Sequence, residues 1–285
     1  MGFARISCAV LFGLVMPSPA WAGDRADDAY DRKDYATALS LYRARAEQGD
    51  AVAQDKLGAM YLLGAGIAQD SGQAALWFRK SADQGLALAQ DSLGHLYLNG
   101  QGVAQDPAEA RTWFRKAADQ ADADAQFMLG VIYERGLGAT RDYNEARQWF
   151  QKAADQGDTS AENNLAFLYS KGLGTEQDYS KALFWYGKAA DGGDANAQYS
   201  LGSMYLKGEG IAQDYAEAAN WYRKAAHLKL PRAEFALGMM YESGIGIAKN
   251  DALAIAMYQR AAAQGNPDAA AALTRLHQPL PSTKP

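Results

Sequence analysis

The sequence repeats itself with a fixed period of 36 residues. The motif Leu-Gly-x-x-Tyr begins at Leu57 and returns at Leu93, and 93 minus 57 is 36. Further copies, one with alanine in place of glycine, begin at Leu129, Leu165, Leu201 and Leu237. A second column keeps the same step at Trp77, Trp113, Trp149, Trp185 and Trp221, with Met257 next. A period of about 20 to 50 residues is typical of stacked repeats, which have no single core and grow by adding units.

Each repeat is predicted to contain two helices. In the first repeat, Asp50 is a suitable N-cap, an apolar stripe at helical spacing runs through Leu57 and Tyr61, and Gly64 ends the helix. The second helix begins at an acidic cap, often with glutamate three residues later, as in a capping box. These pairs are Asp106 with Glu109, Asp142 with Glu145, and Asp214 with Glu217. The fold class is therefore all-α, a solenoid of antiparallel helix pairs.

The first 22 residues are predicted to be a signal peptide. Arg5 is a short basic region, the run from Ile6 to Met16 is apolar, and Ala20-Trp21-Ala22 is a cleavage motif. We expect an exported protein, periplasmic or secreted. Because Cys8 is the only cysteine, the mature chain would have neither a disulfide nor a catalytic thiol. No later apolar run approaches the ~20 residues of a transmembrane helix.

Three segments follow the predicted signal peptide. Residues 23–49 are interpreted as an N-terminal capping half-repeat, 50–265 as six repeats without insertion, and 266–285 as a C-terminal capping helix with a disordered tail. One junction is irregular, because Lys229 stands where other repeats have glycine and Pro231 follows it. We expect a modest change of helix angle there.

The sequence offers no catalytic or metal-binding constellation. His95, His227 and His277 are far apart and lack zinc-ligand spacing, so neither a metal nor a cofactor is predicted. The G-x-G pairs follow helices rather than strands, which favours turns over a phosphate loop. A lysine column beginning at Lys80 has Asp83 three residues later, which favours a neutralised solvated face over a polyanion site. The net charge of −5 argues against a nucleic-acid partner and an anionic membrane surface.

The pattern A-x-x-x-L-G-x-x-Y-x-x-G-x-G-(I/V)-x-x-D-x-x-x-A-x-x-W-(F/Y)-x-K-A-A resembles the Sel-one-like repeat, a relative of the tetratricopeptide repeat. The resemblance covers residues 50–265 and implies a right-handed superhelical solenoid that serves as an adaptor for other proteins. One branch of the family has a disulfide in each repeat, and some of its members are described as binding penicillin-like compounds. This chain lacks those cysteines, so that activity is not carried over, and the family implies no catalytic residues.

Function is expected where the columns do not repeat. The columns that begin at positions 55, 59 and 62 lie on a face of the first helix apart from Leu57 and Tyr61, and in this type of solenoid the first helix lines the concave side. The predicted partner-binding residues are Asp55, Asp91, His95, Phe127, Asn163, Phe167, Tyr199, Phe235 and Met239. Rigid aromatic side chains on such a surface suit binding anchors. The alternative, that they fill space between neighbouring helices, stays open.

These observations favour a non-catalytic scaffold that binds a protein or peptide on its concave face. The partner is unidentified, and a cell-envelope protein or a host protein are both compatible with export. One alternative is a binder of cell-wall glycan or peptidoglycan, because aromatic platforms also stack on sugars. The other is an enzyme such as a β-lactam hydrolase, which rests only on the family association.

Overall fold

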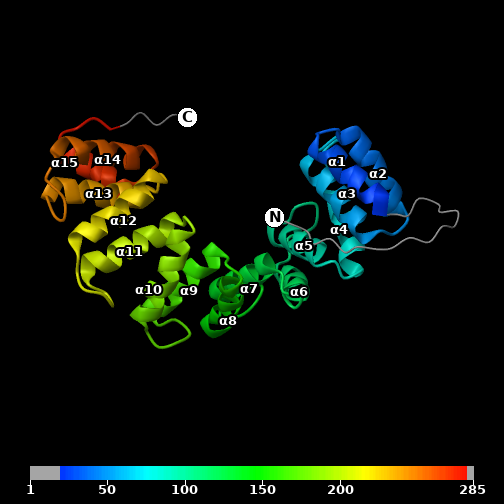
Figure 1. Cartoon of the computed structure of the whole chain (residues 1–285), viewed down its shortest axis with the longest axis horizontal. Coiled ribbons are helices and arrows are strands. Elements are labelled where there is room, and N and C mark those ends of the chain that lie inside the picture. The colour runs from blue at the N-terminus through cyan, green and yellow to red at the C-terminus, as the bar shows by residue number, and fades with distance from the viewer. Residues whose placement is uncertain (1–19, 281–285) are drawn as a thin grey trace, which may run out of the picture. The chain divides into compact units, whose positions relative to one another are not determined.

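The computed structural model describes the backbone of residues 20–280 and the side chains of residues 25–280. This part of the chain forms fifteen α-helices and contains no strand, which confirms the all-α prediction (Figure 1). The helices are α1 (Ala20–Asp31), α2 (Tyr35–Glu47), α3 (Ala51–Leu63), α4 (Ser71–Asp83), α5 (Ala87–Asn99), α6 (Pro107–Ala118), α7 (Ala123–Arg135), α8 (Tyr143–Asp155), α9 (Thr159–Lys171), α10 (Tyr179–Asp191), α11 (Ala195–Lys207), α12 (Tyr215–His227), α13 (Pro231–Ser243), α14 (Asp251–Ala263) and α15 (Pro267–Arg275).

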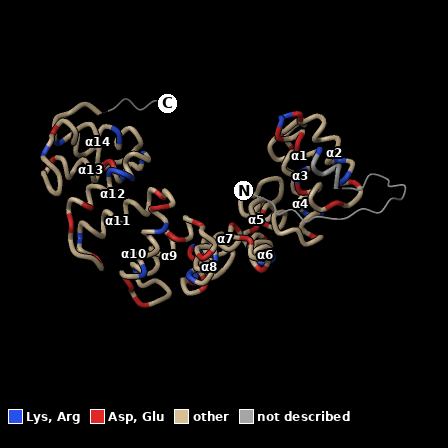
Figure 2. Tube along the Cα trace, in the orientation of Figure 1, with Lys and Arg blue, Asp and Glu red and all other residues tan. Residues whose placement is uncertain are grey.

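The chain divides into two compact units at Lys116, within α6. In the first unit, the helices from α1 to α5 pack on one another in chain order, and in the second unit the helices from α7 to α15 do the same. The six predicted repeats correspond to the helix pairs α3–α4 through α13–α14. We call the two members of each pair the first helix and the second helix. Acidic and basic residues are interspersed along the backbone of both units (Figure 2).

Aspartate caps begin four of the six first helices, as predicted, and α5 and α13 begin at Leu86 and Leu230 without a side-chain cap. The side chain of Asp50 accepts a hydrogen bond from the backbone N–H of Ala53 at 3.1 Å, and Asp122, Asp158 and Asp194 act in the same way. The reciprocal half of the predicted capping box is wrong. The backbone N–H of Asp106 donates to the carbonyl of Tyr97 in the preceding helix at 2.9 Å. This bond ties the second helix to the first, and it leaves Glu109 to accept from the Trp113 indole at 2.9 Å.

Glycine follows leucine in the repeated motif because an aromatic ring lies against the first helix. At Gly130 an added Cβ would stand 2.4 Å from the Phe150 ring of the second helix, and at Gly238 it would stand 2.6 Å from Tyr258. The glycine two residues after the C-cap glycine of the first helix serves a different contact. A Cβ on Gly246 would lie 2.2 Å from the carbonyl oxygen of Tyr215, at the start of the preceding repeat's second helix. Glycine therefore permits close approach both within and between repeats.

The glutamine column that begins at Gln54 is structural, as the sequence indicated. The Gln54 amide donates to the carbonyl of Ala46 at 3.0 Å, and the same bond recurs at Gln90, Gln126 and Gln198. Where the column holds Glu234 instead, the side chain cannot donate. Arg260 replaces the missing donor, since it bonds the Ala226 carbonyl at 3.0 Å and pairs with Glu234 at 2.6 Å. Burial raises the pKa of Glu234, and the Arg260 charge opposes this effect.

The lysine column lies over the tryptophan column. The ammonium of Lys152 is 3.8 Å from the centre of the Trp149 ring, and four further repeats have the same arrangement at 3.6 to 4.6 Å. A cation in this position is attracted by the negative face of the indole. The lysines therefore pack on the framework of the repeats, and Lys188 also pairs with buried Glu162 at 2.8 Å.

The two ends of the repeat array have additional helices. Residues 23–49, interpreted as a half-repeat, contain most of α1 and all of α2, which pack together. Residues 1–19, which are most of the predicted signal peptide of residues 1–22, and residues 281–285 of the tail lie outside the described residues. The C-terminal helix predicted after Asn266 is α15, with Asn266 as its cap. At the irregular junction Lys229 adopts a φ of 61° after α12, at a position that is glycine in four repeats and Ala121, with a φ of 65°, in the second repeat.

Candidate functional site

Three of the predicted aromatic residues are packed on their own repeat. The rings of Phe127, Tyr199 and Phe235 lie 5.8, 5.3 and 5.6 Å from the ring of the second helix, with tilts of 40 to 42°. These partner rings are the ones that lie against the motif glycines. Each first-helix ring is half-buried, so it is held by packing and still presents an edge to solvent. This geometry is therefore compatible with both interpretations of these residues, as binding anchors and as residues that fill space between neighbouring helices.

The remaining residues on this face of the second unit are more open. Phe167 and Met239 are 38% and 46% exposed, while Asn163 is half-buried and its amide approaches the Asn164 oxygen at 3.3 Å. The Arg232 guanidinium lies 4.5 Å from the centre of the Tyr199 ring. Apolar and polar groups therefore alternate along the first helices α7, α9, α11 and α13. We call this set of residues, at positions 127, 163, 167, 199, 235 and 239, the first-helix face.

The acidic residues predicted for the first unit are buried rather than presented to solvent. Asp55 is 4% exposed, and its Oδ1 atom has no hydrogen-bond partner among the described residues. Burial raises the pKa of Asp55 to about 6. Asp91 is 8% exposed and lies 3.6 Å from the Nε2 atom of His95, whose ring packs edge-on against Phe114. Asp55, Asp91 and His95 belong to the first unit, whereas the residues of the first-helix face belong to the second unit.

A pocket of about 580 Å³ lies at the C-terminal end of the first-helix face. Two predicted residues, Phe235 and Met239, line it. The other lining residues come from α13, α14 and α15 and are Glu242, Ser243, Tyr258, Asp268, Ala271, Ala272 and Arg275. Pockets of about 300 to 1,000 Å³ are the size that proteins use for compact ligands or anchoring side chains. Phe235 and Met239 form an apolar wall of the pocket, and Glu242, Tyr258 and Arg275 form a charged wall opposite in character.

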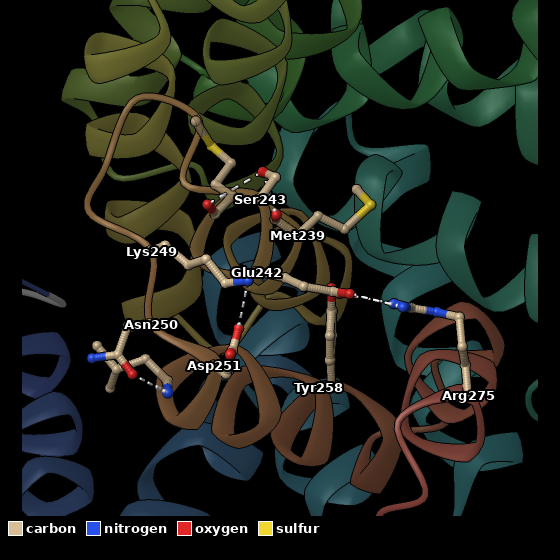
Figure 3. A network of polar contacts seen from close by, with 10 residues as sticks. Met239, Glu242, Ser243, Lys249, Asn250, Asp251, Tyr258 and Arg275 are labelled. Atoms are coloured by element: carbon tan, nitrogen blue, oxygen red, sulfur yellow. Dashed lines mark hydrogen bonds and ion pairs between the residues drawn. The ribbon is translucent and has the colours of Figure 1, made fainter.

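The charged wall is one connected network (Figure 3). The two nitrogens of the Arg275 guanidinium lie 2.8 Å from the two carboxylate oxygens of Glu242, and the Tyr258 hydroxyl donates to the same carboxylate at 2.7 Å. Hydrogen bonds from Arg275 and Tyr258 hold the pKa of Glu242 below its usual range. Burial raises the pKa of Tyr258, and the bond to Glu242 raises it further. The carboxylate is thus anionic, oriented and partly solvent-facing.

Sequence reasoning missed Glu242 and Arg275. Position 242 belongs to a column that begins at Leu62 and does not repeat, as Glu134 and Ser170 in it show. The variability of this column could have identified Glu242 as a candidate binding residue. Arg275 lies in the terminal helix, where no repeat comparison points to it.

Two features are absent from the described residues. Among the described residues, no group of three or more His, Cys, Asp or Glu side chains has an arrangement that could hold a metal ion. In the part of the chain that the structure describes, no helix has the length and apolar character required to cross a bilayer. The arrangement offers rigid ring edges, a thioether and an oriented ion pair along one side of consecutive helices.

Comparisons with known proteins agree with this architecture. The profile of the Sel1 repeat matches six consecutive segments, residues 51–86, 87–122, 123–158, 159–194, 195–230 and 231–266. The chain is similar to a solved protective antigen present in uropathogenic Escherichia coli strains, at 40% identity and a TM-score of 0.79, over 85% of this chain. It spans only 52% of that longer protein. A search of curated proteins found no match.

Two further solved structures show the same fold. A Sel1 repeat protein from Oxalobacter formigenes matches at 32% identity and a TM-score of 0.78, over 84% of this chain and 96% of that chain. An immunity protein from Pseudomonas aeruginosa matches at 20% identity and a TM-score of 0.50, over 81% and 89% of the two chains, which is a likeness of fold alone. From the six matched segments and the 32% and 40% identical structures, we conclude that this chain belongs to the Sel1 repeat family.

Proposed function

We propose that the chain is a non-catalytic scaffold that binds a protein or peptide on the first-helix face of residues 117–280. The observation that carries this proposal is the contrast between constant and variable columns. Leucine, glycine, glutamine and tryptophan recur because the helix pairs require them. Three residues in the variable columns are aromatic, and each is held by the ring of the second helix in its repeat. An aromatic side chain that is already held in this way loses little conformational entropy when a partner covers it.

The C-terminal pocket is the proposed anchor point of this surface. Phe235 and Met239 supply apolar contact, and the Glu242–Arg275 pair supplies an oriented acceptor and donor at the rim. Charge pairs at the rim of an interface favour one orientation of the partner more than they add affinity. We further propose that cleavage after Ala22 exports the protein, which would place the partner in the periplasm or outside the cell.

Site-specific photo-crosslinking tests this proposal. Phe167, which is 38% exposed on the first-helix face, is replaced by benzoylphenylalanine in the full chain, expressed in its natural host. The matched control replaces Phe184, which is 59% exposed on second helix α10 and packs edge-on against Trp185 at 5.0 Å. We expect a discrete protein adduct from position 167 and not from position 184. Adducts of the same protein from both positions, or none from either, would contradict the proposal.

The competing functions give different results in parallel assays. A glycan binder would sediment with purified cell wall that has been stripped of protein, and would lose that property when Phe167 and Phe235 become alanine. A β-lactam hydrolase would turn over a chromogenic β-lactam. We expect neither result from the intact chain.

A further inference from the structure

A hydrogen bond between two side chains closes the end of several repeats. The residue that follows the last turn of the second helix is a glutamine, and its amide nitrogen donates to the buried glutamine or glutamate at the start of the first helix. These bonds are Gln84 to Gln54 at 2.7 Å, Gln156 to Gln126 at 2.9 Å, and Gln264 to Glu234 at 2.7 Å. In the repeats with a glutamine pair, the buried amide therefore uses both its donor and its acceptor.

The fifth repeat lacks this closing bond. Leu228 occupies the position of the closing glutamine and is 48% exposed. The buried partner, Gln198, is 7% exposed and still donates to the Ala190 carbonyl at 3.2 Å. That bond fixes which end of the amide is oxygen, and the Oε1 atom has no hydrogen-bond partner among the described residues. A buried carbonyl oxygen without a donor is unfavourable, and proteins rarely keep one without a reason.

The same position opens into a pocket of about 690 Å³. The lining residues come from the α10–α11 turn, from α11 and from α12, and are Gly193, Gln198, Glu217, Asn220, Arg223, Lys224, His227 and Leu228. None of them belongs to the first-helix face. The pocket thus combines an unpartnered acceptor, an exposed apolar side chain and a group of basic side chains.

The charge of this pocket distinguishes it from the equivalent place in other repeats. His227 stands in a column that holds Asp83, Asp119, Asp155 and Asp191 elsewhere. Two neighbouring cations are held in place: Lys224 lies 3.7 Å from the Trp221 ring, and Arg223 donates to Asn220 at 2.8 Å. Glu217 lies at the other end of α12, about 15 Å from His227 at 1.5 Å per residue. Among the residues that line the pocket, the end nearest Gln198 is therefore the basic end.

We propose that this pocket, which we call the Leu228 pocket, binds an extended acidic peptide segment. Gln198 Oε1 is covered in the free chain, so a backbone N–H of the segment would donate to it once the exposed Leu228 side chain moves aside. A carboxylate side chain would lie between Arg223 and Lys224, and an apolar side chain would cover Leu228. The inference is independent of the proposed function, because the two surfaces share no residue.

Fluorescence anisotropy with a labelled peptide tests the proposal. The probe is an N-acetylated, C-amidated peptide of sequence Gly-Glu-Leu-Glu-Gly, compared with Gly-Gln-Leu-Gln-Gly. The decisive variant is Leu228→Gln, which restores the closing glutamine of the other repeats. We expect the intact chain to bind the acidic peptide, and Leu228→Gln to bind it at least about tenfold more weakly, the effect of about one lost hydrogen bond. This variant should also melt at a higher temperature, so failure to fold would not explain the loss.

Two further variants separate the contributions of charge and of the unpartnered oxygen. Arg223→Gln, at an exposed position, should weaken binding of the acidic peptide and not binding of the Gln peptide. Gln156→Leu creates the same vacancy in the third repeat, where Asp155 replaces the histidine, and it should not produce a second site. Equal affinity of the intact chain and Leu228→Gln for the acidic peptide would overturn the proposal. So would the absence of binding to the intact chain at about 1 mM peptide, which is a very weak affinity for a built site.

Discussion

Asp55→Asn should change how the stability of the chain depends on pH. Asp55 is 4% exposed, and burial without a hydrogen-bond donor for Oδ1 raises its pKa from 3.8 to about 6. The folded state therefore binds this proton more tightly than the unfolded state does. The stabilisation is complete below pH 3.8 and is lost as the pH rises through about 6. Asparagine occupies the same column at Asn163, so the repeat accepts the amide.

The magnitude follows from the two pKa values. A rise from 3.8 to about 6 corresponds to about 3 kcal/mol of unfolding free energy between full protonation and full ionisation. About 2 kcal/mol of this difference falls between pH 4 and pH 7. The variant lacks the titrating group, so its stability relative to the natural chain should improve by about that amount over this range. The amide can also change the unfolding free energy by an amount that does not depend on pH. That amount cancels, because only the change of the free-energy difference with pH is compared.

Urea denaturation followed by circular dichroism at several pH values measures this difference. Asp124→Asn, which removes an exposed carboxylate on α7, is the control for deleting one charge. The prediction concerns the slope with pH of the difference between Asp55→Asn and the natural chain. A difference that stays constant between pH 4 and pH 7 would show that Asp55 is not held in a desolvated site, and the argument from its burial would fail.

Three other substitutions test the packing of the repeats. Gly130→Ala should lower the free energy of unfolding by about 1 to 3 kcal/mol, because its Cβ would stand 2.4 Å from the Phe150 ring, and a Tm unchanged from the natural chain would refute the close approach. Lys229→Gly should raise the unfolding free energy by about 1 kcal/mol, since Lys229 holds a φ of 61°, and a loss of stability in thermal melts would contradict this. Trp149→Ala should cost about 3 to 5 kcal/mol and leave crosslinking on the first-helix face intact under conditions where the variant is folded, as checked by near-UV circular dichroism.

Local chemistry and the fixed period of 36 residues made most of the framework predictable. A cap, a left-handed glycine and an apolar stripe act within one helix. The six copies of Gly64 and Leu57 and the four copies of Asp50 could therefore each be interpreted independently. The second arm of the capping box was not predictable in this way. Its donor, the Asp106 backbone N–H, bonds the carbonyl of Tyr97, and that choice depends on how the two helices meet.

Sequence alone determined the all-α class, the helix pairs and their register, because those follow from short-range rules repeated at a constant interval. Tertiary structure decided which variable residues are buried and which meet. It placed Asp55 in the interior, joined Glu242 to Arg275 across 33 residues, and left Gln198 facing Leu228 instead of a donor. These outcomes depend on distances between side chains of different helices, and a one-dimensional period contains no information about such distances.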